Sequence, residues 1–225
     1  MNLLMFYKDI EALEEWTRKE ARRKSEQEKR TAIRIAIIDD QPFSGQQNLR
    51  NAGYNVTEIG DIKNVAEIIQ YPIVLCDLQD VGAHFQSKYQ GGFLIDEIKK
   101  NFPDKFVIAY TGGSPDQSVV NYARRNADAF IRKDVDINEW RDTLDEIIDT
   151  LSDPLEVWRR QRDALVDVDV STKEILRLED AFVRSVLNRS KYNYADFVSR
   201  VTTNKDVRSI GQSLVASGIF EFIVG

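Results

Sequence analysis

The sequence contains little of what secreted, zinc-binding or membrane proteins depend on. Its 225 residues include one cysteine and one histidine, so no intrachain disulfide is possible and His84 has no second histidine as a metal-binding partner. No apolar run approaches the roughly 18 residues that cross a bilayer, and the run 3–7 is too short for a secretion signal. We therefore expect a cytoplasmic protein with no membrane partner.

The chain also lacks an excess of positive charge. Its formal net charge is -6 at pH 7 and its pI is about 5.0. Residues 1–30 contribute +1, residues 31–150 contribute -7, and residues 151–225 are neutral. Only Arg159, Arg160 and Arg162 form a basic cluster. This distribution argues against nucleic-acid binding through bulk charge.

Five short apolar runs alternate with helical patterns in the middle of the chain. Runs of this length between helices are typical of buried parallel strands. They cover residues 33–38, 54–59, 73–76, 106–110 and 129–131. The alternation predicts an α/β fold whose parallel sheet has helices on both faces.

Four of these runs end in polar residues with related chemistry. Asp39 and Asp40 follow the first run, Asp77 the third, Thr111 the fourth, and Lys133 comes two residues after the fifth. In a parallel sheet these ends meet along one edge, which is where open α/β sheets place their sites. Three close carboxylates repel one another unless a cation joins them, and oxygen-only ligands favour Mg²⁺.

The chain divides into three predicted regions. Residues 1–30 form an amphipathic and charged helix, residues 31–151 form the α/β domain, and residues 152–225 are mostly helical. The apolar seam of the first helix consists of Leu3, Phe6, Ile10 and Leu13. Docking on its own domain, dimerisation and binding of a partner all stay open for this helix. The end of the chain, 218–225, is expected to be a strand or an apolar tail.

The polar strand ends resemble the motifs of response-regulator receiver domains. The matching segments are 35–42, 74–78, 107–112 and 126–133, in that order along the chain. The resemblance covers residues 31–151 and implies a flavodoxin-like sheet with strand order 2-1-3-4-5. That order places the first and third strands side by side, so that Asp39, Asp40 and Asp77 can share an ion.

The resemblance also implies a role for each residue. Asp77 is the expected phosphoryl acceptor, and Asp39, Asp40 and Asp77 are the expected Mg²⁺ ligands. Thr111 is expected to bond a phosphoryl oxygen, and Lys133 to pair with one. Thr111 and Phe130 are the expected switch residues. Phosphoryl transfer spreads negative charge over oxygen atoms, so a cation, an ammonium and a hydroxyl suffice as catalytic groups.

Three features depart from the family pattern. The loop from Asp77 to Gly91 is long, and Val81 stands where the family usually has proline. Asp134 follows Lys133 in place of another proline, and Gly112 is followed by a second glycine. His84 lies in the long loop and is expected to be a surface residue.

The sequence therefore predicts a signalling protein and not an enzyme, controlled by phosphorylation in a two-component phosphorelay. Its expected partners are a histidine kinase or phosphotransfer protein and an unidentified output protein. Two alternatives stay open. One is a receiver-like scaffold that is never phosphorylated, and the other is a DNA-binding response regulator.

Overall fold

The computed structural model describes residue 8 and residues 10–20, 24–201 and 205–224. They fall into two compact units. One spans residues 26–148, and the other combines described residues of 1–25 with those of 149–225. The predicted regions, 31–151 and 152–225, have slightly different boundaries, and the division into domains stays a prediction. No helix of the described residues is long and apolar enough to span a membrane.

The unit 26–148 is built on a five-stranded sheet in which all neighbouring strands are parallel. The strands are β1 (Arg34–Ile38), β2 (Asn55–Glu58), β3 (Ile73–Asp77), β4 (Phe106–Thr111) and β5 (Ala129–Arg132). Their order is β2-β1-β3-β4-β5. The predicted fold class and strand order are confirmed. All residues of β3 and β4 are buried, as expected for central strands covered on both faces.

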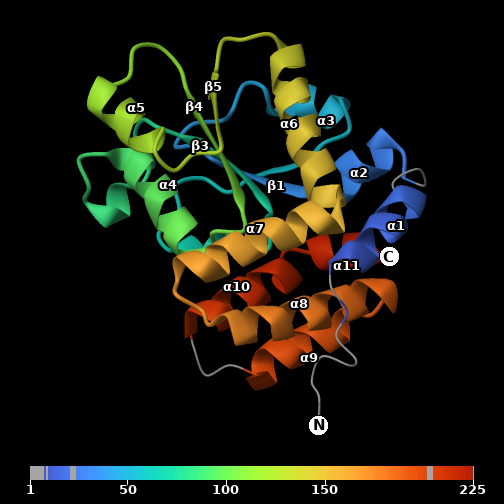
Figure 1. The fold of residues 1–225 in the computed structure, drawn as a ribbon. Helices are drawn as coiled ribbons and strands as arrows, with labels where there is room; N and C mark the ends of the chain where they lie inside the picture. Colours follow the sequence, from blue (N-terminus) through green and yellow to red (C-terminus); the bar gives the residue numbers. More distant parts are fainter. Residues whose placement is uncertain (1–7, 9, 21–23, 202–204, 225) are drawn as a thin grey trace. The chain divides into compact units, whose positions relative to one another are not determined.

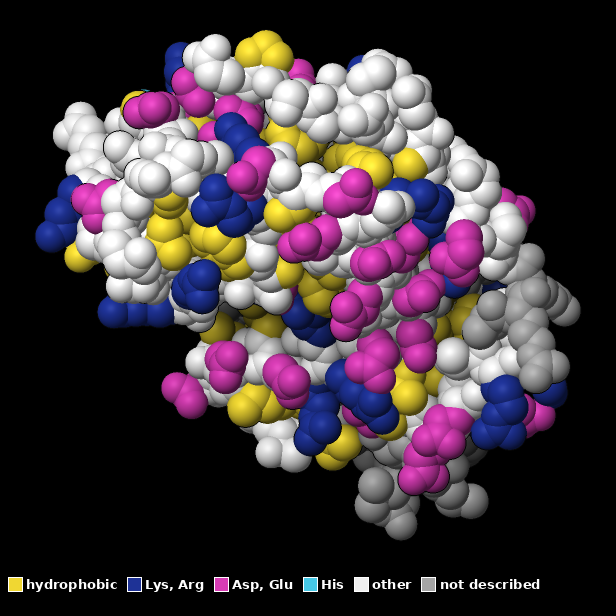
Figure 2. Space-filling view, turned by 90° about the horizontal axis from the view of Figure 1, so that it is seen from above, with side chains coloured by type: hydrophobic (Ala, Val, Ile, Leu, Met, Phe, Trp, Pro, Cys, Tyr) yellow, Lys and Arg dark blue, Asp and Glu magenta, His cyan; other side chains and the backbone are white. Residues whose placement is uncertain are grey.

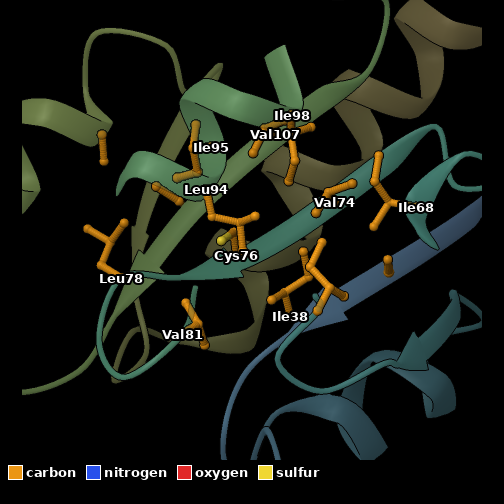
Figure 3. Packing of buried hydrophobic residues seen from close by; sticks show 14 of the residues in the cluster. Ile38, Ile68, Val74, Cys76, Leu78, Val81, Leu94, Ile95, Ile98 and Val107 are labelled. Atoms are coloured by element: carbon orange, nitrogen blue, oxygen red, sulfur yellow. The ribbon is translucent and has the colours of Figure 1, made fainter. Parts of the chain in front are cut away.

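Helices cover both faces of this sheet (Figure 1). They are α2 (Glu26–Ala32), α3 (Gln46–Asn51), α4 (Gln90–Asn101), α5 (Gln117–Ala123) and α6 (Ile137–Ser152), with 3-10 helices η2 (Val65–Ile68) and η3 (Ala83–Phe85). Residues of α4 and α5 pack on the face formed by Val74, Cys76 and Val107. Figure 3 shows this core, which Val81 of the long loop also enters.

The strand register brings the polar ends to one level. Ile38 of β1 pairs with Cys76 of β3, so Asp39 and Asp77 follow at neighbouring positions. Asp77 itself pairs with Tyr110 of β4, and Thr111 pairs with Arg132 of β5. The parallel register therefore brings the polar residues together at the edge of the sheet where the sequence predicts a site.

The second unit contains helices joined by short loops, and its described residues include no strand. Its helices are α1 (Glu11–Glu20), α7 (Pro154–Asp167), α8 (Thr172–Leu187), α9 (Lys191–Val201), α10 (Lys205–Ala216) and α11 (Ile219–Val224). Asp153 caps α7 by accepting the Leu155 N–H, and Ser171 caps α8 by accepting the Glu174 N–H. The core of this unit contains a cluster of mutually contacting aromatic rings, those of Trp158, Phe182, Tyr194 and Phe220.

Two predictions of secondary structure are wrong. Residues 1–30 are not one helix, because Lys24 and Ser25 are not helical and the helices on either side belong to different units. Of the predicted seam, Leu3 and Phe6 lie outside the described residues, and Leu13 is buried in the helical unit. The end of the chain is helix α11 and not a strand, because Phe220, Ile223 and Val224 share one buried helical face.

Candidate functional site: an acidic cluster at the carboxyl edge of the sheet

Three carboxylates meet where β1 and β3 end. One carboxylate oxygen each from Asp39, Asp40 and Asp77 lie within 4.8 Å of one another. Asp39 and Asp77 are 5% and 3% exposed, whereas Asp40 is exposed to solvent. The cluster is therefore half inside the protein and open on the side of Asp40.

Lys133 supplies a positive charge to the two buried carboxylates. Its Nζ lies 2.6 Å from Asp77 Oδ2 and 2.9 Å from Asp39 Oδ2. Its backbone N–H donates to the Thr111 carbonyl over 2.8 Å, which fixes the chain just beyond β5. The lysine reaches the site although Asp134 replaces the usual proline, and the described residues contain no cis peptide bond.

Burial and this ion pair together set the protonation of the site. Burial raises the pKa of Asp77 above its ordinary value, and the hydrogen bond from Lys133 opposes that rise. Burial lowers the pKa of Lys133, but its bonds to Asp77 and Asp39 outweigh burial and leave the pKa raised. The ammonium therefore stays charged and balances part of the negative charge.

The two oxygens of Asp77 have different surroundings. Oδ1 accepts the backbone N–H groups of Leu78, over 2.7 Å, and Gln79, over 3.3 Å. Oδ2 accepts from a side chain instead, the Lys133 ammonium, over 2.6 Å. Gly91, at the start of α4, passes so close that a Cβ there would collide with the Asp77 carbonyl oxygen. The backbone therefore anchors Oδ1 and leaves Oδ2 for chemistry.

Thr111 and Phe130 have different surroundings. The buried Thr111 hydroxyl donates to Gln79 Oε1 over 3.4 Å and to the Gly112 carbonyl over 3.3 Å. Phe130 is partly buried against the core beneath α4 and α5, with the Arg124 guanidinium 4.8 Å from its ring centroid. Of the predicted residues, Lys133 is thus joined directly to the carboxylates, Thr111 borders them, and Phe130 belongs to a different layer.

The long loop after Asp77 is tied down and does not extend freely into solvent. Asp61 accepts the Gly82 N–H over 2.6 Å, and the Tyr89 ring stacks on Tyr122 with centroids 4.2 Å apart. Val81 is buried in the core where the family usually has proline. His84 is exposed and makes an edge contact with Phe85, in agreement with its prediction as a surface residue.

Sequence reasoning missed Tyr110. It ends the apolar run 106–110, and its hydroxyl donates to Asp39 Oδ2 over 2.7 Å. Burial, followed by the bond to Asp39, raises the pKa of Tyr110, so the hydroxyl keeps its proton and remains a donor. The available signal was a phenol at the end of an otherwise apolar run, directly before Thr111.

The donor set of the cluster fits a divalent cation. Three carboxylates offer oxygen ligands only, which suits Mg²⁺ better than zinc or copper. The exposed side of Asp40 leaves room for the water molecules that Mg²⁺ usually keeps. Asp39, Asp40 and Asp77 are the residues that would hold the ion.

Comparisons with known proteins find partial matches among solved structures alone. No protein-family model matches the sequence, and no curated protein matches it either. Among solved structures, a CheY-like receiver domain protein from Methanospirillum hungatei JF-1 is 25% identical with a TM-score of 0.42, covering 52% of this chain and 94% of its own. The receiver domain of NtrX from Brucella abortus is 22% identical with a TM-score of 0.43, covering 52% of this chain and 98% of its own. Over about half of its length, this chain resembles response-regulator receiver domains.

Proposed function

We propose that this chain is a signalling protein of a two-component system that is switched by phosphorylation of Asp77. One observation carries the proposal: Asp77 Oδ2 lies within reach of an ammonium, at 2.6 Å, and belongs to a cluster of three carboxylates. A structural role alone would not require two further acidic groups beside a buried aspartate, because like charges at this distance destabilise a fold.

The chemistry assigned to Asp77 is a phosphoryl transfer from a phosphohistidine of a histidine kinase or phosphotransfer protein. Asp77 Oδ2 forms the new bond to phosphorus, the bond from phosphorus to nitrogen breaks, and its electron pair stays on the imidazole. The N–H groups of Leu78 and Gln79 hold Oδ1 while this happens. When bound, Mg²⁺ neutralises negative charge on the transferring group.

Lys133 and Thr111 are placed to respond to the new group. Phosphorylated Asp77 is an acyl phosphate whose carboxyl group no longer carries the charge that Lys133 pairs with, so the ammonium can pair with a phosphoryl oxygen in its place while it keeps its contact with Asp39. The Thr111 hydroxyl would exchange its long bonds to Gln79 and Gly112 for a phosphoryl oxygen. Gly113, whose φ is 57°, gives the following loop a conformation that few other residues adopt easily. We propose that this movement, together with Phe130, is the switch.

The proposed output is contact with a protein and not with DNA. Residues 151–225 carry no net charge, so they offer few phosphate neutralisations. On the face that Figure 2 shows, lysine and arginine side chains are interspersed with acidic ones and form no continuous basic patch among the described residues. In this proposal the chain is a signalling protein and not an enzyme that converts a separate substrate. Its cytoplasmic location stays a prediction.

Phosphorylation with acetyl phosphate tests the proposal. Wild-type protein should gain the mass of one phosphoryl group when Mg²⁺ is present and none when the metal is chelated. Asp77→Asn should gain none. Asp80→Asn is the matched control, because Asp80 lies in the same loop but outside the cluster, and it should behave like wild type. No adduct on wild type would favour the unphosphorylated scaffold, and an adduct on Asp77→Asn would move the acceptor elsewhere.

A further inference from the structure

Tyr110 is a fully buried phenol whose hydroxyl reaches the acidic cluster. It is 0% exposed, lies in the central strand β4, and donates to Asp39 Oδ2 over 2.7 Å. The same hydroxyl lies 3.4 Å from the Ile38 carbonyl, just before Asp39. The phenol therefore contacts the part of the chain that carries two of the three carboxylates.

The ring of Tyr110 is held on several sides. The rings of Phe43 and Trp140 lie 5.2 Å and 5.7 Å from it, measured between centroids, and the two also contact each other at 5.2 Å. Lys133 Nζ lies 5.2 Å from the Tyr110 ring centroid. A phenol has few rotatable bonds, so a fixed ring fixes the hydroxyl.

The contacts of Asp39 show what this hydroxyl does. Asp39 Oδ2 receives Tyr110 and Lys133, while Oδ1 accepts the Gln41 N–H over 3.0 Å. Of these three partners, Lys133 is the one expected to move when a cation or phosphoryl group arrives. Tyr110 and the Gln41 backbone would then be the groups that keep the carboxylate oriented.

We propose that Tyr110 is a positioning residue for divalent-cation binding, acting through Asp39, an inference that rests on the metal site of the proposed function. Partners that orient metal-binding carboxylates typically contribute 10–100-fold to affinity. The effect should be specific to metal binding. Tyr54 offers the comparison, since its hydroxyl donates to Asp145 Oδ1 over the same 2.7 Å but away from the cluster.

Calorimetric titration of the full chain with Mg²⁺ tests the role of Tyr110. Tyr110→Phe keeps the ring and removes the hydroxyl, and should weaken Mg²⁺ binding about tenfold. Tyr54→Phe loses an equally short bond to a carboxylate and should bind Mg²⁺ like wild type. Thermal unfolding without metal separates an effect on stability from an effect on Mg²⁺ binding. Both variants should lose stability, while only Tyr110→Phe should lose Mg²⁺ affinity.

Several outcomes would overturn the inference. One is that Tyr110→Phe binds Mg²⁺ with an affinity within twofold of wild type. Another is that Tyr54→Phe loses as much Mg²⁺ affinity as Tyr110→Phe does. A third is that wild type binds no Mg²⁺. Should Tyr110→Phe fail to fold, Phe43→Leu loosens the ring and keeps the hydroxyl, and unchanged affinity there would also contradict the role. A wild type that binds Mg²⁺ but takes up no phosphoryl group would contradict the proposed function and leave this inference standing.

Discussion

The two units bury carboxylates in different ways. In the unit 26–148, Asp39 and Asp77 are buried beside each other and beside Lys133. In the helical unit, Glu179 is 8% exposed, and its Oε2 accepts the indole N–H of Trp158 over 2.7 Å. One unit concentrates charge at the edge of a sheet, and the other uses a carboxylate as an acceptor within an aromatic core.

This difference distinguishes a functional buried carboxylate from a structural one. Glu179 resembles Gln161 of the same unit, which accepts the Tyr194 hydroxyl over 2.6 Å. Each of the two side chains accepts a hydrogen bond from the polar group of a buried aromatic residue. Asp77 has an anionic neighbour that a purely structural role would avoid. Burial is shared, and it is the acidic neighbours of Asp77 that mark this residue as the functional candidate.

The largest expected effect is that of Lys133→Met. Removing the ammonium leaves Asp39 and Asp77 buried without their cation, so the metal-free protein should lose about 3 kcal/mol of unfolding free energy. Mg²⁺ should restore part of that loss. Denaturant unfolding with and without Mg²⁺ measures both, and Lys63→Met, an exposed lysine of the same unit, is the control. If Lys133→Met loses no more unfolding free energy than the control, the carboxylates of the cluster do not repel one another appreciably.

A second lysine of the same unit should respond to pH. Lys105 is buried and donates to the carbonyls of Ile69 and Tyr71, and burial lowers its pKa to about 8. Between that pKa and the ordinary lysine value of 10.5, the unfolded chain therefore binds more protons than the folded one, so the free energy of unfolding rises with pH there.

Comparison with Lys105→Met isolates this contribution. As the pH rises from about 7.5 to 9.5, the free energy of unfolding of wild type should rise by about 2 kcal/mol relative to that of the variant. The reason is that the buried amine loses its proton in the folded protein, so that folding no longer has to bury a charge. Denaturant unfolding of both proteins at the two pH values measures the gain. A constant difference between them would mean that Lys105 stays charged in the folded protein.

Glu179→Gln tests the structural side of the comparison. Glutamine keeps an oxygen that can accept the Trp158 N–H, so the loss of stability should be about 1 kcal/mol. That loss should be the same with and without Mg²⁺, unlike the loss in Lys133→Met. Denaturant unfolding with and without Mg²⁺ measures the loss. A Mg²⁺-dependent effect would remove the distinction between the two kinds of buried acid.

The smallest expected change in stability is that of Asp40→Ala. Asp40 is exposed, so its removal should alter metal-free stability by no more than about 0.5 kcal/mol, or raise it by relieving repulsion. The variant should nevertheless lose most of the stabilisation that Mg²⁺ gives wild type. Asp134→Ala, an exposed carboxylate paired with Arg132, is the control and should keep it. A large metal-free loss in Asp40→Ala would make Asp40 structural.

Much of the fold could be predicted because local patterns and tertiary packing agree. The five apolar runs became β1 to β5, and the region 152–225 is helical in its described residues, as predicted. The failures occurred where local pattern was ambiguous. Charged residues around Lys24 suit a helix by propensity, yet the chain passes there from one compact unit to the other. Phe220, Phe222 and Val224 alternate in sequence, but a helix buries Phe220 and Ile223 together.

The sequence by itself determined which residues stand at the strand ends, because side-chain patterning gives the strands, and parallel strands share one edge. That was enough to bring Asp39, Asp40, Asp77 and Lys133 together. Only the tertiary structure decided how the carboxylates are held, since the hydroxyl of Tyr110 reaches Asp39 from two strands away. Such contacts depend on the distance between strands and on ring packing, and no local sequence pattern encodes either of them.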